Sequence, residues 1–292
     1  MLLRSLAKLP ITVTARTASP FESPEIVFRF APPFAAVEVE LGCSTDFVCD
    51  QLRVNSPAPE TWDHVCGEVL RIRSFLFDHY AMAEPAFLNE GNELAGNAGN
   101  LAAVLRLRER KDFERLEAEF CRLLPEFSGL GFREVPVGRV QLVAQLRDQK
   151  DQISAENLSQ GTLYVLAALA LAFDSAPPSM ICIEEIDRGI HPRLLREIRD
   201  ILYRLSYPES FGEKRAPVQI VATTHSPYLL DLFKDHPEEV VIAQKEGQEA
   251  RFERLVDRSD FQELLKEGPL GDIWFSGILG GVPEEKLPEE TQ

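Results

Sequence analysis

The sequence ICIEEIDRGIHP, from Ile181 to Pro192, carries the strongest indication of the fold. Its apolar start is typical of a short parallel strand that is covered on both faces. The strand runs directly into two adjacent carboxylates, Glu184 and Glu185. Ligands of open α/β sheets bind at the carboxyl ends of the strands, so this pattern predicts a functional site where the strand ends.

The segment that follows completes a strand–helix–strand unit. PRLLREIRDILYRL, from Pro192 to Leu205, has apolar residues at helical spacing and a proline in the first turn. After a charged loop, VQIVATTHS, from Val218 to Ser226, predicts a second buried strand. Such units have right-handed crossovers and neighbouring strands, so we expect His225 at the same edge of the sheet as the two carboxylates.

Upstream, NLSQGT precedes LYVLAALALAF, a segment so apolar on every face that it predicts a fully buried helix. The helix start presents backbone N–H groups and the positive end of the dipole. Ser159 can donate to a phosphate oxygen, and Gly161 allows a ligand to approach the backbone closely. The alternative is an ordinary N-cap, formed by Asn157 or Ser159.

The carboxylates and the histidine also have two interpretations each. One of Glu184 and Glu185 would help to hold Mg²⁺ through a water, and the other would polarise an attacking water. Alternatively, both acids simply enter solvent before a helix N-terminus, which favours anions. His225 would contact a terminal phosphate or hold the water, or it is a satisfied histidine beside the capping residue Ser226. The order of the three motifs, with one helix fitting each gap, favours the functional interpretation.

Composition bounds the remaining choices. The chain has 292 residues, 45% of them hydrophobic, which is enough for a sizeable core. A formal charge of −16 disfavours non-specific attraction to nucleic acid or to an anionic membrane, although a local basic groove is compatible with it. No apolar run reaches 18 residues, so we expect no transmembrane helix. Five cysteines without a CxxC pair suggest reduced thiols and a cytoplasmic protein.

We therefore expect an α/β fold with a mainly parallel sheet and flanking helices. NLAAVLRLRER and DFERLEAEFCRLL predict two helices, and EVVIAQKEGQEARFERL predicts a hairpin that turns at Glu246 and Gly247. The expected parts are an N-terminal β-rich portion (1–90), a helical insertion with a strand (91–150), the core with the three motifs (151–257), and a C-terminal helix with an acidic tail (258–292).

The three motifs in this order resemble the C-terminal half of ABC-type ATPase heads, and most closely the AAA-family ATPases related to RecF, SMC and OLD proteins. NLSQGT resembles their signature motif, ICIEEIDRGIHP their Walker B segment, and VATTHSP their switch-histidine motif. GNLAAVLRL and LGDIWFSGILGGVP resemble stretches of stand-alone members. The resemblance covers residues 65–283 loosely and 151–230 well.

This resemblance implies a P-loop NTPase-like fold that binds ATP with Mg²⁺ and hydrolyses it. It gives Glu184 the metal role, Glu185 the water-polarising role and His225 the role of γ-phosphate switch. Asp187 falls in the following D-loop region.

The signature motif implies a partner. Ser159, Gln160 and Gly161 would contact the γ-phosphate of a nucleotide held by a second protomer, which implies a homodimer that sandwiches two ATP molecules.

The sequence departs from the family pattern at three points. Glu184 stands where aspartate is commoner, and Gln160 replaces a glycine. The 292 residues also contain no G-x-x-x-x-G-K-[ST] loop and no Gly-Lys dipeptide, and no Q-loop glutamine can be assigned. That loop would supply most of the triphosphate contacts, and phosphoryl transfer depends mainly on such positioning.

Three explanations follow for the missing loop: the sequence is a fragment, a second polypeptide supplies the loop, or the protein is a pseudo-ATPase. We thus expect the C-terminal half-site of an ATPase head used in DNA maintenance or phage defence. The alternatives are a non-catalytic dimerisation or regulatory module and the nucleotide-binding subunit of a transporter. Nucleic acid is a conceivable partner that the net charge does not support, and no membrane association is expected.

Overall fold

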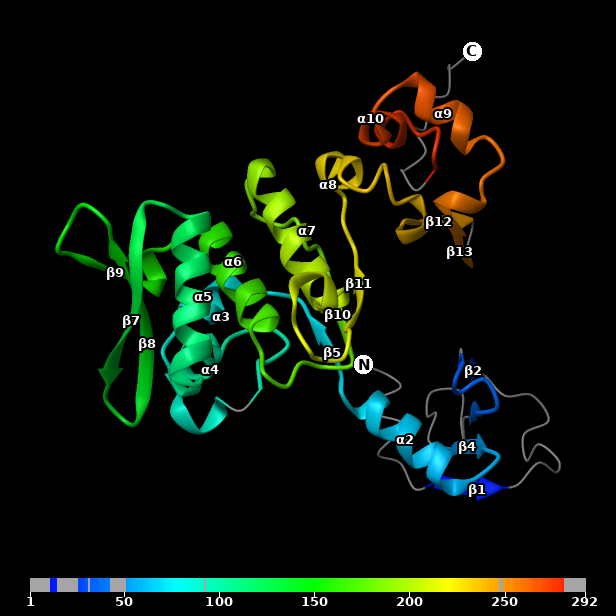
Figure 1. Cartoon of the computed structure of the whole chain (residues 1–292), viewed down its shortest axis with the longest axis horizontal. Helices are drawn as coiled ribbons and strands as arrows, with labels where there is room; N and C mark the ends of the chain where they lie inside the picture. The colour runs from blue at the N-terminus through cyan, green and yellow to red at the C-terminus, as the bar shows by residue number, and fades with distance from the viewer. Residues whose placement is uncertain are drawn as a thin grey trace, which may run out of the picture. The chain divides into compact units, whose positions relative to one another are not determined.

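The protein is described from a computed structural model, which covers residues 11–14, 26–30, 32–42, 51–91, 93–246 and 249–280. The chain forms two units, and each is assembled from separated stretches of sequence. The first unit comprises residues 1–76, 174–183 and 205–221, and the second comprises 77–173, 184–204 and 222–292. Figure 1 labels most of the helices and strands used below.

The first unit contains a sheet with the strand order β1-β4-β3-β2 and a helix, α2. These elements are β1 (Ile11–Thr14), β2 (Ile26–Arg29), β3 (Glu38–Gly42), β4 (Gln51–Asn55) and α2 (Pro59–Leu70). Trp62, Val65 and Val69 of α2 recur at helical spacing and pack against the buried apolar residues of β3 and β4. Strands β1 and β2 lie in the N-terminal portion that the sequence predicted to be rich in strands, whereas α2 was not predicted.

A second sheet of this unit contains the strand that ends at the paired carboxylates. Its strands are β5 (Ile72–Phe75), β10 (Met180–Ile183) and β11 (Gln219–Ala222), in the order β11-β10-β5. β5 and β10 pair in parallel, with Ile183 opposite Phe75. Helix α7 (Pro192–Ser206) connects β10 to β11 along the chain. The prediction that the two motif-bearing strands are neighbours is therefore confirmed.

The sequence predicted that the second strand, β11, would be buried, and this prediction is wrong. In β11, Gln219, Val221 and Ala222 are exposed, and Val221 keeps 50% of its surface accessible. The physical reason is position, because β11 is the outermost strand of this sheet among the described residues. A segment rich in β-branched residues is suited to a strand, but its composition does not reveal whether another strand pairs with it on each side.

The second unit contains an antiparallel sheet with helices beside it (Figure 1). Its elements are α3 (His79–Ala83), β6 (Ala86–Phe87), α4 (Leu101–Leu107), α5 (Arg110–Leu123), β7 (Phe127–Val135), β8 (Arg139–Leu146), β9 (Gln152–Ser154) and α6 (Gln160–Ala172). Helix α6 is buried at every position from Gly161 to Ala172, as its uniform apolarity predicted. The two helices expected after residue 100 are also confirmed. Parallel pairing of β1 with β4 and of β5 with β10 therefore coexists with antiparallel pairing, which occurs in both units.

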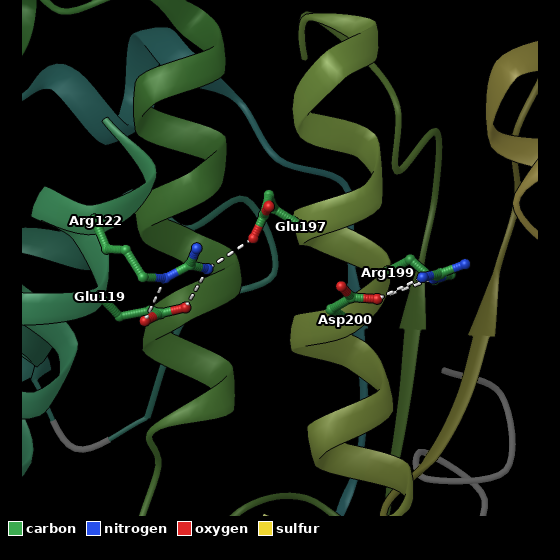
Figure 2. Close-up of polar contacts among 5 residues, drawn as sticks. All are labelled: Glu119, Arg122, Glu197, Arg199 and Asp200. Carbon is green, nitrogen blue, oxygen red and sulfur yellow. Dashed lines mark hydrogen bonds and ion pairs between the residues drawn. The ribbon is translucent and has the colours of Figure 1, made fainter. Parts of the chain in front are cut away.

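Helix α7 is held from two sides within the second unit. Arg122 of α5 donates to Glu119 at 2.8 Å and to Glu197 of α7 at 2.6 Å, and we call this group the Arg122 clamp (Figure 2). Hydrogen bonds from the guanidinium to these carboxylates raise the pKa of Arg122 further above its ordinary value. On another part of α7, Arg199 donates to the carbonyl of Leu232 at 3.0 Å. The clamp and this bond tie α7 to α5 and to the segment after the His225 motif.

The C-terminal part of this unit has its own apolar cluster. Its elements are α8 (Pro227–Asp231), β12 (Val241–Glu246), β13 (Glu249–Arg254), α9 (Phe261–Glu267) and α10 (Leu270–Phe275). The cluster consists of Leu230, Leu255, Phe261, Leu264, Leu270, Ile273 and Leu279. The predicted hairpin is confirmed as β12 and β13, although its expected turn at Glu246 and Gly247 falls partly outside the described residues.

Short 3₁₀ segments complete the chain: Leu88–Glu90, Ala155–Asn157, Pro208–Phe211, Pro237–Glu239 and Leu255–Asp257. Within the described ranges, no helix combines the length and the apolar character needed to span a bilayer.

Candidate functional site

The paired carboxylates begin a tight turn. Glu184 directly follows β10, and both acids are exposed. Glu185 has a φ of +48°, a left-handed conformation that is uncommon for a residue other than glycine. The chain then folds back, with Arg188 N–H donating to the Glu185 carbonyl at 2.9 Å. We call residues 185–190 the Glu185 turn. Strain of this kind persists only where the surroundings enforce it, and it clusters at functional sites.

Two threonines after β11 enforce this conformation. The backbone N–H of Glu185 donates to Thr223 Oγ1 at 3.0 Å, and that of Ile186 donates to the Thr223 carbonyl at 3.1 Å. The hydroxyl of Thr224 donates to the half-buried carboxylate of Asp187. Sequence reasoning assigned no role to these threonines. The available signal was their position, side by side between an apolar strand and His225.

His225 lies directly after this pair. It is exposed, and its ring forms no hydrogen bond, ion pair or ring contact with the described part of the chain. The next residue, Ser226, accepts from the backbone N–H of Leu229 at 3.3 Å and caps α8. The cap predicted at Ser226 is therefore confirmed. The imidazole is therefore available to a ligand. The alternative, in which other residues of the protein hydrogen-bond to its ring nitrogens, is not seen among the described residues.

The start of α6 is a capped helix terminus. Ser159 Oγ accepts from the backbone N–H of Thr162 at 3.1 Å, which confirms Ser159 as the N-cap. Asn157 instead donates to Ser154 Oγ at 3.2 Å. Ser159 is exposed as a residue, but its Oγ also shares a hydrogen bond of 2.8 Å with Thr162 Oγ1. The hydroxyl therefore has two partners within the first turn of α6, and its contact with a phosphate stays a prediction.

The two residues after the cap face the protein's own chain. A Cβ atom on Gly161 would lie 2.7 Å from the carbonyl oxygen of Gly189, so this glycine admits a close approach by the Glu185 turn. The close approach of the protein's own chain is therefore one reason for a glycine at this position. Gln160 donates from Nε2 to Tyr164 Oη at 3.1 Å. The contacts of Gln160 and Gly161 with a second protomer's nucleotide stay a prediction.

The charges of the site are only partly compensated. Glu185 forms an ion pair of 3.5 Å with Arg188, and both side chains are 50% exposed, so solvent screens the pair strongly. Glu184 has no polar partner among the described residues. Carboxylate oxygens are the ligands that Mg²⁺ prefers, and the exposed pair fits a hydrated ion. The arrangement can therefore offer a metal ligand, a proton acceptor and an imidazole from adjoining segments.

A second group of potential metal ligands lies elsewhere in this unit. His236, Glu238 and Glu239 are exposed, with one ligand atom of each within 4.8 Å of the others. These side chains already have partners, because His236 contacts Glu238 at 3.2 Å and Tyr203 donates to Glu239. A backbone hydrogen bond within Glu238, followed by the contact with His236, lowers the pKa of that carboxyl.

The mixed α/β fold and the order of the motifs are those of an AAA domain. Residues 71–231, more than half of the chain, match the family described as "AAA domain, putative AbiEii toxin, Type IV TA system", and the protein belongs to this family. A solved structure described as "Crystal structure of the SmcHead bound to the C-winged helix domain of ScpA" is 15% identical, with a TM-score of 0.47 over 74% of this chain and 67% of that chain. No curated protein gives a sequence match. The expected α/β character of the chain is confirmed, because helices and strands alternate in both units.

Proposed function

We propose that this protein binds and hydrolyses ATP as an AAA/ABC-type head, and that the described residues supply the carboxylate half of its site. The observation that carries the proposal is the left-handed Glu185 turn, held by Thr223 and Thr224 at the ends of neighbouring strands. Such a turn costs roughly 1–3 kcal/mol of strain, which is more than a mere exit from a strand requires. It holds the Glu185 backbone in one orientation at the sheet edge.

The proposed roles follow from the chemistry of each group. Glu184, for which the described part of the chain offers no polar partner, would hold Mg²⁺ through a water. Glu185 would accept the proton of the attacking water, and His225 would contact the γ-phosphate. Bound Mg²⁺ would neutralise charge that develops on the phosphate oxygens. Ser159 and the N-terminus of α6 offer donors and a positive dipole end to an anion.

The phosphate-cradling loop must come from residues outside this sequence. The support is the absence of any Gly-Lys dipeptide together with the exposed edge of β11. An exposed apolar edge strand is a template for pairing with another strand. A strand added beside β11 would end next to the segment that carries His225. The source would be either an upstream part of a longer protein or a second polypeptide.

The biological setting is also part of the proposal. The family's description as a putative toxin of a toxin–antitoxin system supports a role in defence rather than in transport. A cytoplasmic homodimer that sandwiches two nucleotides is proposed from the ATPase class. The rival function is a non-catalytic dimerisation or regulatory module, which the missing phosphate loop favours.

The first experiment is to translate the DNA upstream of Met1 in frame and to measure ATP binding by the 292-residue chain and by any longer form. The half-site proposal expects no detectable Mg²⁺-dependent binding by the 292 residues alone, because positioning contacts are missing. Hydrolysis of ATP by the 292 residues alone would refute the half-site proposal. A loop-containing form that does not bind ATP would instead support the non-catalytic module.

The second experiment tests the role of Glu185 in a form that hydrolyses ATP. Glu185→Gln keeps the side-chain length but removes the base, so turnover should stop while nucleotide-driven dimerisation persists. The matched control is Glu134→Gln, another exposed glutamate of the same unit. Full activity of Glu185→Gln would remove this residue from the proton-accepting role.

A further inference from the structure

The start of α6 and the Glu185 turn are joined by one side chain, that of Gln160. A Cβ atom on Gly189 would lie 2.5 Å from Gln160 Cδ and 2.7 Å from its Cγ, so the side chain lies flat against this glycine. Gly189 has a φ of +67°, which an L side chain rarely adopts. Glycine is therefore required there both by the backbone conformation and by the space that Gln160 occupies.

Gln160 is itself held in place. Its Nε2 donates to Tyr164 Oη at 3.1 Å, and the Tyr164 hydroxyl donates to the Phe77 carbonyl at 2.6 Å. Tyr164 is 3% exposed and its ring contacts that of Phe77, so the acceptor for Gln160 is part of the core. Because this hydrogen bond already restricts the rotamers of the Gln160 side chain, packing against Gly189 costs it little further conformational entropy.

The Glu185 turn is thus held on two sides. Thr223 and Thr224 hold its first half through hydrogen bonds. Gln160 and Gly161 hold its second half by packing against Gly189. The left-handed residue Glu185 belongs to a segment of six residues with contacts at both ends, which leaves the turn little room to relax.

We propose that Gln160 is a positioning residue for Glu185. Its side chain occupies the space beside Gly189 and is itself fixed by Tyr164, so it restricts the conformations in which the turn can present the Glu185 carboxylate. The use of that carboxylate in hydrolysis rests on the proposed function, whereas the restraint on the turn is a property of the folded chain.

The test is hydrogen exchange by mass spectrometry on the full 292-residue chain. Gln160→Ala should speed exchange of the Ile186, Arg188 and Ile190 amides by about two- to tenfold, the factor for loss of one hydrogen bond and its packing. Gln160→Met keeps the packing and loses the hydrogen bond, so it should have a smaller effect in the same direction. The control is Gln149→Ala, an exposed glutamine of the same unit, which should change nothing in the turn.

Two readouts separate positioning from general stability. Exchange within residues 163–172 of α6 should stay at the wild-type rate, whereas a merely structural role would speed it together with the turn. Gly189→Ala should accelerate exchange of the turn less in the Gln160→Ala background, because the side chain with which it clashes is absent. Where Gln160→Ala does not fold, Gln160→Met decides, and wild-type exchange in its turn overturns the inference.

Nucleotide assays distinguish this inference from the proposed function. In a form that hydrolyses ATP, Gln160→Met should lower kcat more than it changes KM, because it misplaces a group used in the chemical step. If no form of the wild-type protein hydrolyses ATP, the proposed function is wrong, but the effect of Gln160 on hydrogen exchange in the Glu185 turn is still a valid test of this inference. Turn exchange that is equal in all variants would overturn the coupling even where ATP is hydrolysed.

Discussion

Replacing Gly161 by alanine tests how closely the start of α6 and the Glu185 turn are packed. The added Cβ would lie 2.7 Å from the Gly189 carbonyl oxygen and 3.7 Å from Ile190 Cα. Carbon–oxygen contacts that short do not occur without movement, and the atom in the way belongs to backbone. The carbonyl must therefore shift by several tenths of an ångström, and the turn that carries Glu185 must shift with it.

The expected magnitude is a balance of two terms. Overpacking a well-filled site costs about 1–3 kcal/mol, and a contact against backbone belongs in the upper part of that range. Alanine gains up to about 1 kcal/mol over glycine in a helix, and less at a helix end. The net expectation is a destabilisation of about 1–2 kcal/mol, which corresponds to a fall in Tm of roughly 2–8 °C for a unit of this size.

The matched control is Gly67→Ala in α2. A Cβ atom there meets nothing within 4 Å, so only the helix term remains and the variant should be more stable by about 0.5–1 kcal/mol. Urea unfolding followed by circular dichroism measures both variants, and hydrogen exchange locates the effect in each. If Gly161→Ala stabilises the chain as Gly67→Ala does, the close contact with Gly189 does not exist and the reasoning fails.

Three further predictions concern contacts at and around the site. Thr224→Val should loosen the turn by about 1–2 kcal/mol, because Asp187 loses a donor, and Thr224→Ser should restore it when turn exchange is measured. Arg122→Ala should cost under about 1 kcal/mol, and less in high salt, because the Arg122 side chain is 56% exposed; urea midpoints at two salt concentrations measure this. The Arg258 guanidinium lowers the pKa of Asp260, so this contact stabilises the protein above the unfolded-state pKa of about 3.9 and is lost as pH falls through the lower folded value. Asp260→Asn should accordingly flatten the acid side of the stability profile, and an unchanged profile would contradict this.

Local patterns determined much of this fold. α6 could be predicted as a buried helix because every residue after its start is apolar, and a helix apolar on all faces has nowhere else to lie. Glu184, Glu185 and His225 could be placed near strand ends because an apolar run ends one to three residues before each of them. Hydrophobic periodicity and turn-forming residues are local signals of a few residues each, so they can be read without knowledge of the tertiary structure.

The burial of a strand, in contrast, could not be predicted from the local sequence. β11 has the composition of an interior strand, yet its place at the edge of the described sheet leaves Val221 half exposed. Helix α2 was missed for a related reason, since its apolar stripe of Trp62, Val65 and Val69 lies within a stretch dominated by turn residues and short strands. Both features depend on which elements come to lie beside the segment.

For this protein, the sequence by itself determined the order of the motifs, the buried helix and the strand ends at which the acids and the histidine lie. Only the tertiary structure decided what these residues touch. It showed that Gly161 admits the carbonyl of Gly189, that the Gln160 side chain packs against Gly189, and that two threonines hold the Glu185 turn. The physical reason is separation, because these contacts join residues far apart in the chain, and their partners are set by packing that no local pattern encodes.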